Sequence, residues 1–286
     1  MFIDFASNYE IKQLLAYSLN EDIRDGDHSS MSCIASEKID TAMLLVKGDG
    51  IIAGIALVQT IIEMVDTNLR METLMKDGDI VKRGDIVFHL KGRTHSILKS
   101  ERLILNFMQR LSGIATITNT YVRAISDTGC KLLDTRKTTP GLRLLEKWAV
   151  FMGGGKNHRI GLYDMIMLKD NHIDAAGGIA KALSMANDYR KRVNPILKIE
   201  VETRTIDEVK QVLKEGIADR IMFDNFTPEK TREAVEIIAN TMETEASGGI
   251  TLANILDYAQ TGVNYISVGA LTHSVKALDL SLKIIK

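Results

Sequence analysis

From about residue 131 to residue 273 the sequence repeats one pattern, in which a short apolar run is followed by a polar cluster and then by a segment with helical spacing. The helical spacing is clearest in Ile206–Glu215, Pro228–Asn240 and Thr251–Thr261. Short strands that alternate with helices are typical of parallel βα units. Six units are too few for an eightfold barrel, so this region predicts an incomplete parallel α/β barrel. The six apolar runs end near Leu133, Leu168, Val201, Phe223, Ala246 and Val268.

Every one of these runs is followed by residues that can bind or react. In α/β barrels the active site lies where the strands end, so these clusters are expected to meet in one cleft. The first two ends offer cations, the third and fourth offer carboxylates, and the last two offer small residues that let a phosphate approach the backbone. This order predicts a site for an anionic ring beside a phosphorylated sugar. The clusters are Asp134 with Arg136 and Lys137, then Lys169, Glu202, Asp224 with Asn225, Ser247 with Gly248 and Gly249, and Gly269.

The stretch from Leu132 to His172 is unusually basic. Cations that adjoin strand ends are suited to holding a small, highly charged anion. The alternative is a solvated basic face, which is the usual meaning of a charge run. We favour the binding site because these charges follow strands and do not line one helix face. The basic residues are Arg136, Lys137, Arg143, Lys147, Lys156, His158, Arg159, Lys169 and His172.

Two motifs in the same stretch suggest other chemistry. The run Gly153–Lys156 resembles a nucleotide-binding loop, but Val150 replaces its first glycine and Asn157 replaces the Ser or Thr that should follow the lysine. Lys169 at a strand end could also act as a Schiff-base lysine. Its cationic neighbours favour a role as a charge, although they could also lower its pKa, and this alternative stays open.

The N-terminal part has a different organisation. A helix is predicted over about residues 8–20, and the acidic loop Glu21–His28 is explained better by turn chemistry than by a metal site. Short β-like runs separated by Gly-Asp turns over about residues 40–97 predict a small sheet domain. Residues 98–125 predict one or two helices, with a break at Gly113.

These patterns divide the chain into two domains. We predict an N-terminal α+β sheet domain over residues 1–115 and an α/β-barrel domain over residues 116–273. A C-terminal helix over residues 274–286 is expected to pack back on the first domain.

The bulk composition limits the partners and the compartment. The net charge of -1 gives no global basic field, so neither nucleic acid nor an anionic membrane is expected as a partner. Two cysteines, Cys33 and Cys130, are far apart and lack metal-ligand spacing, which favours a reduced intracellular protein. The start of the sequence has no basic region of a secretory signal, and no apolar run is long enough to span a bilayer. A cytoplasmic location is therefore expected.

The clusters around the predicted cleft resemble one known family, quinolinate phosphoribosyltransferase, also called carboxylating nicotinate-nucleotide pyrophosphorylase. The resemblance covers nearly the whole chain and is most specific over residues 134–172. It is carried by Asp134–Gly141, Gly153–Gly155, Asn157–Arg159, Gly161–Leu162, Lys169–His172, Asp224–Asn225, Ser247–Gly249 and Ser267–Ser274, and more loosely by Glu21–Asp27 and residues 101–115.

The resemblance implies a reaction and an assembly. Members transfer phosphoribosyl from phosphoribosyl pyrophosphate to quinolinate with Mg²⁺, and they release nicotinate mononucleotide, pyrophosphate and CO₂ in NAD biosynthesis. It also implies a homodimer with shared active sites, with a higher oligomer left open. In that dimer Arg102 would reach into the partner's site, a role that its local sequence does not reveal.

The same resemblance implies roles for individual residues. Catalytic roles fall to Lys137, Lys169, Glu202 and Asp224, and the two carboxylates could hold Mg²⁺ directly or indirectly. The quinolinate pocket maps onto Arg102, Arg136, His158, Arg159 and Lys169, with Lys137 shared between the two ligands. The substrate-binding residues as a whole are Arg102, Thr135, Arg136, Lys137, His158, Arg159, Lys169, Glu202, Asp224, Ser247, Gly248, Gly249, Val268, Gly269, Ala270 and His273.

Two alternative functions remain at this stage. Transfer to nicotinate without CO₂ release would need fewer cations than this sequence supplies. A non-catalytic phosphate-binding or carrier protein is the second, because the surroundings of Lys76 faintly resemble a biotin or lipoyl hairpin. A carrier lysine must project from an exposed hairpin tip, and the match here is loose.

Overall fold

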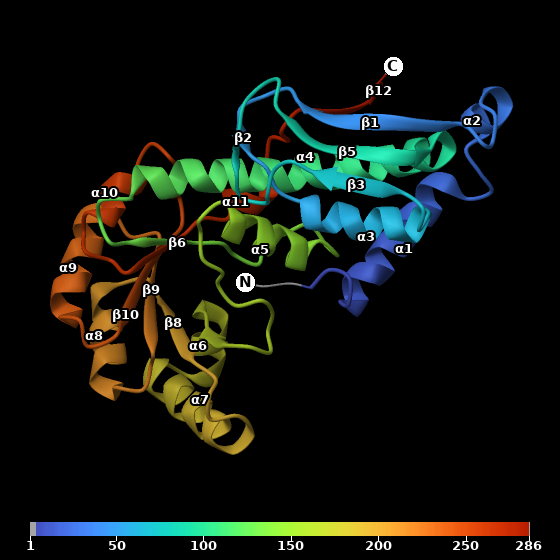
Figure 1. The fold of residues 1–286 in the computed structure, drawn as a ribbon. Helices are drawn as coiled ribbons and strands as arrows, with labels where there is room; N and C mark the ends of the chain where they lie inside the picture. Colours follow the sequence, from blue (N-terminus) through green and yellow to red (C-terminus); the bar gives the residue numbers. More distant parts are fainter. Residues whose placement is uncertain (1–3, 286) are drawn as a thin grey trace. The chain divides into compact units, whose positions relative to one another are not determined.

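The computed structural model describes residues 4–285, and the chain divides into two compact units (Figure 1). The first unit contains the residues up to Asn119, the segment Thr139–Gly154 and the residues from Ser274 on. The second unit contains Thr120–Thr138 and Gly155–His273. The mixed α/β fold predicted from the sequence is confirmed, with an antiparallel sheet in the first unit and a parallel sheet in the second.

An antiparallel sheet in the order β12-β1-β5-β3 is the centre of the first unit, and β2 pairs separately with β4. Alternate residues of β1 are buried, as expected of a strand with one face packed on a core. The strands are β1 (Ile39–Val46), β2 (Gly50–Ile51), β3 (Arg70–Thr73), β4 (Ile80–Val81), β5 (Ile86–Arg93) and β12 (Leu280–Ile285). The helices are α1 (Tyr9–Ile23), α2 (His28–Cys33), α3 (Ile55–Val65), α4 (Thr94–Ala124) and α5 (Arg143–Met152).

The predicted helix break at Gly113 is wrong, because α4 runs without interruption from Thr94 to Ala124. Gly113 is needed for packing instead. A Cβ atom at this position would meet the carbonyl oxygen of Lys276 and would lie 2.9 Å from Val275 Cγ1. The glycine therefore lets a distant part of the chain approach the helix surface.

The predicted C-terminal helix is also wrong. Residues Leu280–Ile285 form β12, which pairs with β1 in the register Val46↔Leu280. Leu278, Leu280 and Leu282 are all buried, and their spacing of two is the period of a strand. The segment does belong to the first unit, but as an edge strand.

One helix of the first unit was not foreseen within the predicted sheet domain. In α3 the run Ile55–Val65 is almost continuously apolar, and periodicity alone cannot separate such a run from a buried strand. The carboxylate of Asp77 accepts hydrogen bonds from the backbone N–H groups of Gly54, Ile55 and Ala56, at 2.6–3.0 Å. A residue more than twenty positions away thus caps this helix, which no local signal could indicate.

The first unit explains two features of the sequence, the acidic loop Glu21–His28 and the glycine run Gly153–Gly155. Asp27 accepts the backbone N–H of Ser30 and begins α2, so turn and cap chemistry explains at least this acid. Gly153 ends α5, and a Cβ there would meet the carbonyl of Ala115 and lie 2.7 Å from Thr118 Cβ. The glycine run is thus a point of close packing, and the segment 139–154, which we had placed in the barrel domain, joins the first unit.

The second unit is built on a parallel sheet in the order β6-β11-β10-β9-β8-β7 (Figure 1). The first two strands of this unit in chain order, β6 and β7, lie at the two edges of the sheet. The strand order is therefore that of a barrel that is open between β6 and β7. This is the incomplete barrel expected from the sequence. The strands are β6 (Lys131–Leu133), β7 (Ile166–Leu168), β8 (Ile199–Thr203), β9 (Arg220–Asp224), β10 (Glu243–Ser247) and β11 (Tyr265–Ser267).

Helices follow the strands, and those from α6 to α10 pack side by side in chain order. Thr205 and Thr227 begin α8 and α9 by accepting backbone N–H groups with their hydroxyls, and Pro228 stands in the first turn of α9. The prediction for α8 matches exactly, whereas α10 is shorter than expected. The helices are α6 (Asp170–Ala176), α7 (Ile179–Val193), α8 (Ile206–Glu215), α9 (Pro228–Ile238), α10 (Ile255–Ala259) and α11 (Ala270–His273).

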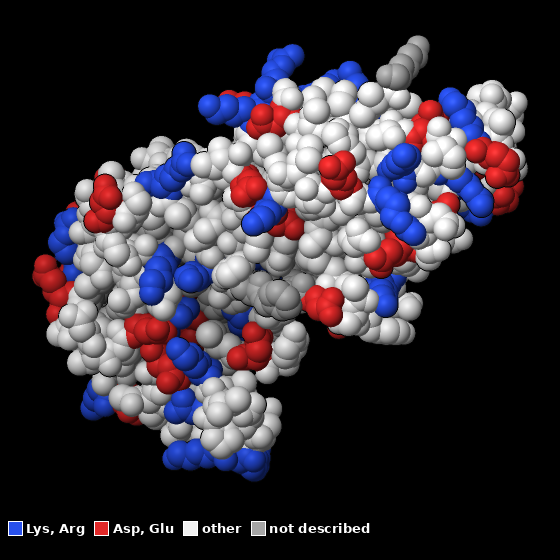
Figure 2. All heavy atoms as spheres, viewed as in Figure 1, with Lys and Arg blue, Asp and Glu red and all other residues white. Residues whose placement is uncertain are grey.

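The surface shows no field of a single sign in the view of Figure 2, where basic and acidic side chains are interspersed. This agrees with the net charge of -1. Among the described residues, every helix is too short or too polar to cross a lipid bilayer.

The packing at Gly113 leads to a stability prediction. We expect Gly113→Ala to lower the free energy of unfolding by about 1–2 kcal/mol, because crowding against a neighbouring backbone costs more than the roughly 1 kcal/mol that alanine gains in a helix. Urea unfolding measures the change, with Asn106→Ala at an exposed position of α4 as the control. A stabilised Gly113→Ala protein would show that the approach at Lys276 is not tight.

Candidate active site

The pairing register of the second unit places the ends of its strands side by side. Ser247 is level with both Asp224 and Ser267, and Ser267 is level with Leu133. Residues that follow the strands therefore converge on one edge of the sheet, where they line a cleft of about 580 Å³. Of the predicted site residues, those that line it are Thr135, Arg136, Lys137, His158, Arg159, Lys169, Glu202, Asp224, Ser247, Gly248, Gly249, Val268, Gly269, Ala270 and His273.

The cleft also has lining residues outside the predicted set. Met167 lies one residue before the end of the edge strand β7, and Met222 lies two residues before the end of the central strand β9. Both add apolar surface to the cleft. Asn225 was part of the family resemblance but had no assigned role. The additional residues are Met167, Met222, Asn225, Ile250, Thr251 and Ser267.

Two arginines meet at one end of the cleft. Arg159 is largely buried, with 8% of its surface exposed, and burial together with the nearby Arg136 guanidinium lowers its pKa. A guanidinium remains charged after such a shift. Two like charges held close in a partly dry cleft are a preformed site for an anion with more than one negative group.

Asp134 holds the loop that carries Arg159. Its buried carboxylate accepts the side-chain amide of Asn157 at 2.6 Å and the backbone N–H of His158 at 2.8 Å. The loop also pairs with β6, since the Lys156 N–H donates to the carbonyl of Leu132. The first polar residue after β6 is therefore an anchor for the site and does not line it.

Lys169 and Glu202 form an ion pair in the cleft, with 2.5 Å between Nζ and Oε2. Lys169 precedes α6, and its backbone N–H donates to His172 Nδ1. Glu202 gives Lys169 a fixed ion-pair partner, so the geometry supports Lys169 as a charge and not as a Schiff-base nucleophile.

The far end of the cleft is formed by glycine loops. Gly248 has φ +92°, and a Cβ there would meet Asn225 Oδ1, so only glycine fits this turn. A Cβ at Gly269 would lie 2.9 Å from the Lys137 side chain. Asn254 holds the first loop by donating to the carbonyl of Gly249. Ligand groups can therefore approach the backbone closely at this end.

Comparison with known proteins gives a consistent result. The family model described as quinolinate phosphoribosyl transferase, C-terminal domain, matches residues 114–283, and the N-terminal domain model matches residues 27–112. The chain belongs to the quinolinate phosphoribosyl transferase family. This confirms the resemblance stated from the sequence and, with it, the expected enzyme class, phosphoribosyl transfer to quinolinate in NAD biosynthesis.

Individual relatives agree with the family assignment. The chain is 48% identical over 291 residues to the chloroplastic nicotinate-nucleotide pyrophosphorylase [carboxylating] of Arabidopsis thaliana, covering 96% of this chain and 83% of that protein. A probable nicotinate-nucleotide pyrophosphorylase [carboxylating] of Bacillus subtilis is 44% identical, with 97% and 94% covered. The solved nicotinate-nucleotide pyrophosphorylase from Francisella tularensis is 41% identical, with a TM-score of 0.92 and full coverage of both chains.

One residue that the family resemblance implicated is absent from the lining of the cleft. Arg102 lies exposed on α4 in the first unit, whereas the cleft is lined by residues of the second unit. Its predicted place in a shared site depends on a second chain and stays a prediction.

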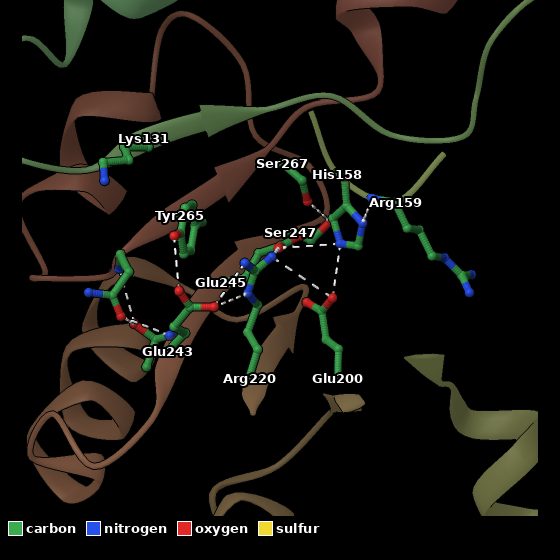
Figure 3. A network of polar contacts seen from close by, with 12 residues as sticks. Lys131, His158, Arg159, Glu200, Arg220, Glu243, Glu245, Ser247, Tyr265 and Ser267 are labelled. Atoms are coloured by element: carbon green, nitrogen blue, oxygen red, sulfur yellow. Dashed lines mark hydrogen bonds and ion pairs between the residues drawn. The ribbon is translucent and has the colours of Figure 1, made fainter. Parts of the chain in front are cut away.

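Four titratable residues lie at or close to the cleft and are here called the buried charge cluster: His158 with Glu200, Arg220 and Glu245, the last three of which the sequence analysis missed (Figure 3). Of these only His158 had been named, and as a substrate contact. Burial opposes a positive charge on His158, but Glu200 and Glu245 outweigh it and raise its pKa to about 9. The Arg159 N–H lies 2.7 Å from Nδ1, however, and leaves no room for a proton there, so in this arrangement the ring carries its proton on Nε2.

The pKa values of the two glutamates that face His158 are shifted in opposite directions. Burial and the nearby Glu245 charge raise the pKa of Glu200, while in Glu245 the contacts with His158 and Arg220 outweigh burial and lower the pKa. A signal for these residues was present in the sequence, because Glu200 and Glu245 are charges inside strands and Arg220 begins one. Charged residues are rarely fully buried unless they are paired.

Proposed function

We propose that this cleft binds quinolinate at its arginine end and phosphoribosyl pyrophosphate at its glycine end, and joins them there. The single observation that carries the proposal is the order of charge along the strand ends. Cations follow β6 and β7, carboxylates end β8 and β9, and glycines follow β10 and β11. Family membership favours this reaction over transfer to nicotinate and over a carrier role.

Quinolinate is a dianion, and paired carboxylates suit paired guanidinium groups. Arg136 and Arg159 face this ligand in our assignment, with His158 and Lys169 beside them and Lys137 between the two substrates. Carboxylates held in a partly dry cleft gain more from each charge than they would in water.

The sugar phosphate is assigned to the opposite end. The 5-phosphate lies against the turns Ser247–Gly249 and Val268–Ala270, with Thr135 and His273 at the border. The turn at Gly249 supports this placement, since a Cβ atom there would meet nothing within 4 Å and the backbone is open to a ligand group.

Mg²⁺ fits the carboxylates of Glu202 and Asp224 as part of a complex with the substrate. The two residues end neighbouring strands and offer the oxygen ligands that this ion prefers. Within residues 4–285, the cluster of three metal-ligand side chains that stands close together is instead His158, Glu200 and Glu245. Two carboxylates suit an ion that keeps waters and phosphate oxygens, and when bound it would neutralise charge on the departing pyrophosphate.

The side chains then act on charge as it develops. As the bond from ribose C1 to pyrophosphate breaks and the bond to the ring nitrogen forms, the ribose becomes cation-like, and Glu202 and Asp224 stabilise it. The carbon–carbon bond to the adjacent carboxylate breaks next. CO₂ leaves, and the electron pair stays on the ring carbon, where Lys137 and Lys169 favour it until a proton from water replaces the carboxylate.

The assembly is proposed as a homodimer in which Arg102 of one subunit completes the site of the other, and a higher oligomer stays open. Two observations support this idea: Arg102 is exposed, and it belongs to the first unit, whereas the residues that line the cleft belong to the second. A cytoplasmic location also stays a prediction.

An assay of product tests the proposed reaction. With quinolinate and phosphoribosyl pyrophosphate we expect nicotinate mononucleotide and CO₂ in equal amounts, and removal of Mg²⁺ with a chelator should slow the reaction strongly. Nicotinate supplied in place of quinolinate should give no product. Equal turnover of both acids would contradict the assignment of the cation-rich pocket to a dianion.

Removal of one arginine should weaken the transition state selectively. We expect Arg136→Ala and Arg159→Ala each to lower kcat/KM for quinolinate by about tenfold to several hundredfold, since a charge-assisted contact contributes roughly 1.5–3 kcal/mol. Lys156→Ala is the matched control, because Lys156 is exposed in the same basic stretch and does not line the cleft. Near-normal turnover in both arginine variants would remove the charge argument.

Mixing variants tests the shared site. Subunits with Arg102→Ala and subunits with Lys169→Ala should each be inactive alone, but a mixed dimer regains one intact site, or about a quarter of normal activity for random pairing. A mixture of Arg136→Ala with Lys169→Ala should give no rescue, because both defects lie in the same subunit's contribution. Mixed dimers that form without rescue in the first case would refute the crossing arginine.

A further inference from the structure

The buried charge cluster forms a layer directly below the cleft. Alternate residues of a strand point to the same face, so Glu200 lies below Glu202 and Glu245 lies below Ser247. Arg220 is level with Glu200 in the pairing of β8 with β9. Barrel interiors are usually filled by layers of apolar side chains, so a charged layer at this depth requires an explanation.

Contacts within the layer are short and specific (Figure 3). Glu245 Oε2 lies 2.9 Å from Arg220 Nη1 and 3.4 Å from His158 Nε2. Glu200 Oε2 lies 3.0 Å from the same histidine nitrogen. Both carboxylate side chains are fully buried, so their charges must be satisfied within the protein.

A metal ion is one possible occupant of such a group, because one histidine and two glutamates are common ligands. Arg220 argues against it. Its guanidinium lies within 4.0 Å of both glutamates and stacks 4.2 Å over the Tyr265 ring, so a fixed cation already stands where the metal charge would be needed. The chain itself therefore already supplies a positive charge to this layer.

The histidine connects this layer to the substrate pocket. Its Nε2 faces the two glutamates, and its Nδ1 accepts the backbone N–H of Arg159 at 2.7 Å. The Arg159 side chain extends away from the layer (Figure 3) and lines the cleft. The orientation of the His158 ring thus determines the position of the Arg159 backbone, from which the Arg159 side chain extends to its ligand.

We propose that Glu245, held by Arg220 and accompanied by Glu200, is a positioning residue that fixes the His158 ring and, through Nδ1, places Arg159 for the quinolinate carboxylates. This inference rests on the proposed binding of quinolinate by Arg159. It differs from a substrate contact, because Glu245 is fully buried and does not line the cleft.

Glu245→Gln tests the proposal, since it keeps the size of the side chain and removes its charge. We expect KM for quinolinate to rise about tenfold, because small misplacements of a binding group are costly, while KM for phosphoribosyl pyrophosphate stays within about twofold. Glu243→Gln is the matched control. Glu243 also binds Arg220, at 3.0 Å, but its side chain is 35% exposed and its other partners are Tyr265 and Lys198.

A double-mutant cycle identifies the route of the effect. In an Arg159→Lys background the Glu245→Gln change should have little further effect on quinolinate binding, whereas in a Lys169→Ala background its effect should add fully. Titration calorimetry with quinolinate measures each variant even when turnover is slow. Additivity with Arg159→Lys would overturn the proposed route.

Thermal unfolding accompanies these measurements. If Glu245→Gln does not fold, Glu200→Gln provides the same test, because it also faces His158 Nε2. Unchanged KM for quinolinate in a folded variant, or equal increases for both substrates, would overturn the positioning role. Absence of quinolinate-dependent activity in the unmodified protein would instead contradict the proposed function and would leave the variant data without a reaction to report on.

Discussion

The register of the parallel sheet is the constraint on which the site depends. Each strand, together with the segment that follows it, contributes one to five residues to the cleft, and those residues are spread over more than one hundred positions of the sequence. Hydrogen bonding between strands brings their carboxyl ends level, and a slip of one residue would turn every inward side chain outward. Within each strand alternate residues share a face, so Glu200 lies below Glu202 in β8 and Glu245 lies below Ser247 in β10. Recognition at the rim and support from below are thus set by one feature of the backbone.

The charged layer has a physical cost that the fold has to offset. Two fully buried carboxylates would be strongly unfavourable alone, and their charge is partly offset by Arg220, 2.9 Å from Glu245, and by the His158 ring, 3.0 Å from Glu200. An apolar layer would provide comparable packing at less risk. A charged layer at this position is explained better by the orientation that it gives the His158 ring than by a gain in stability. An ion pair fixes the angle of a ring more closely than apolar contact does. The loop of Arg159 is held from two sides, by Asp134 through its preceding backbone and by His158 through its own.

The sequence allowed the barrel and most of the cleft to be predicted, because these features depend on alternation and on the residues that directly follow strands. It failed where the deciding contact is distant. A glycine such as Gly113 usually indicates a helix break, but here it allows the close approach of Lys276. Helix α3 is capped by Asp77, which is also distant in the sequence. The final strand was mistaken for a helix because its pairing partner is β1, more than two hundred residues earlier. Glu200 and Glu245 were not predicted because they lie inside strands, whereas the predicted site residues are those at and just after the strand ends.

The pairing of Lys169 with Glu202 shows how the cleft can hold opposite charges without losing either to the other. Lys169 Nζ lies 2.5 Å from Glu202 Oε2, so the two side chains offset each other within the cleft. In the proposed function, a quinolinate carboxylate would bind Lys169 in place of Glu202, and the Glu202 carboxylate would then be available to the ribose. The side chain of Glu202 is 11% exposed and that of Lys169 is 43% exposed, so the carboxylate is already largely removed from water, whereas the lysine still gives up water when a ligand binds. The ion pair therefore couples the two halves of the cleft, since filling the pyridine side prepares the carboxylate for the ribose side.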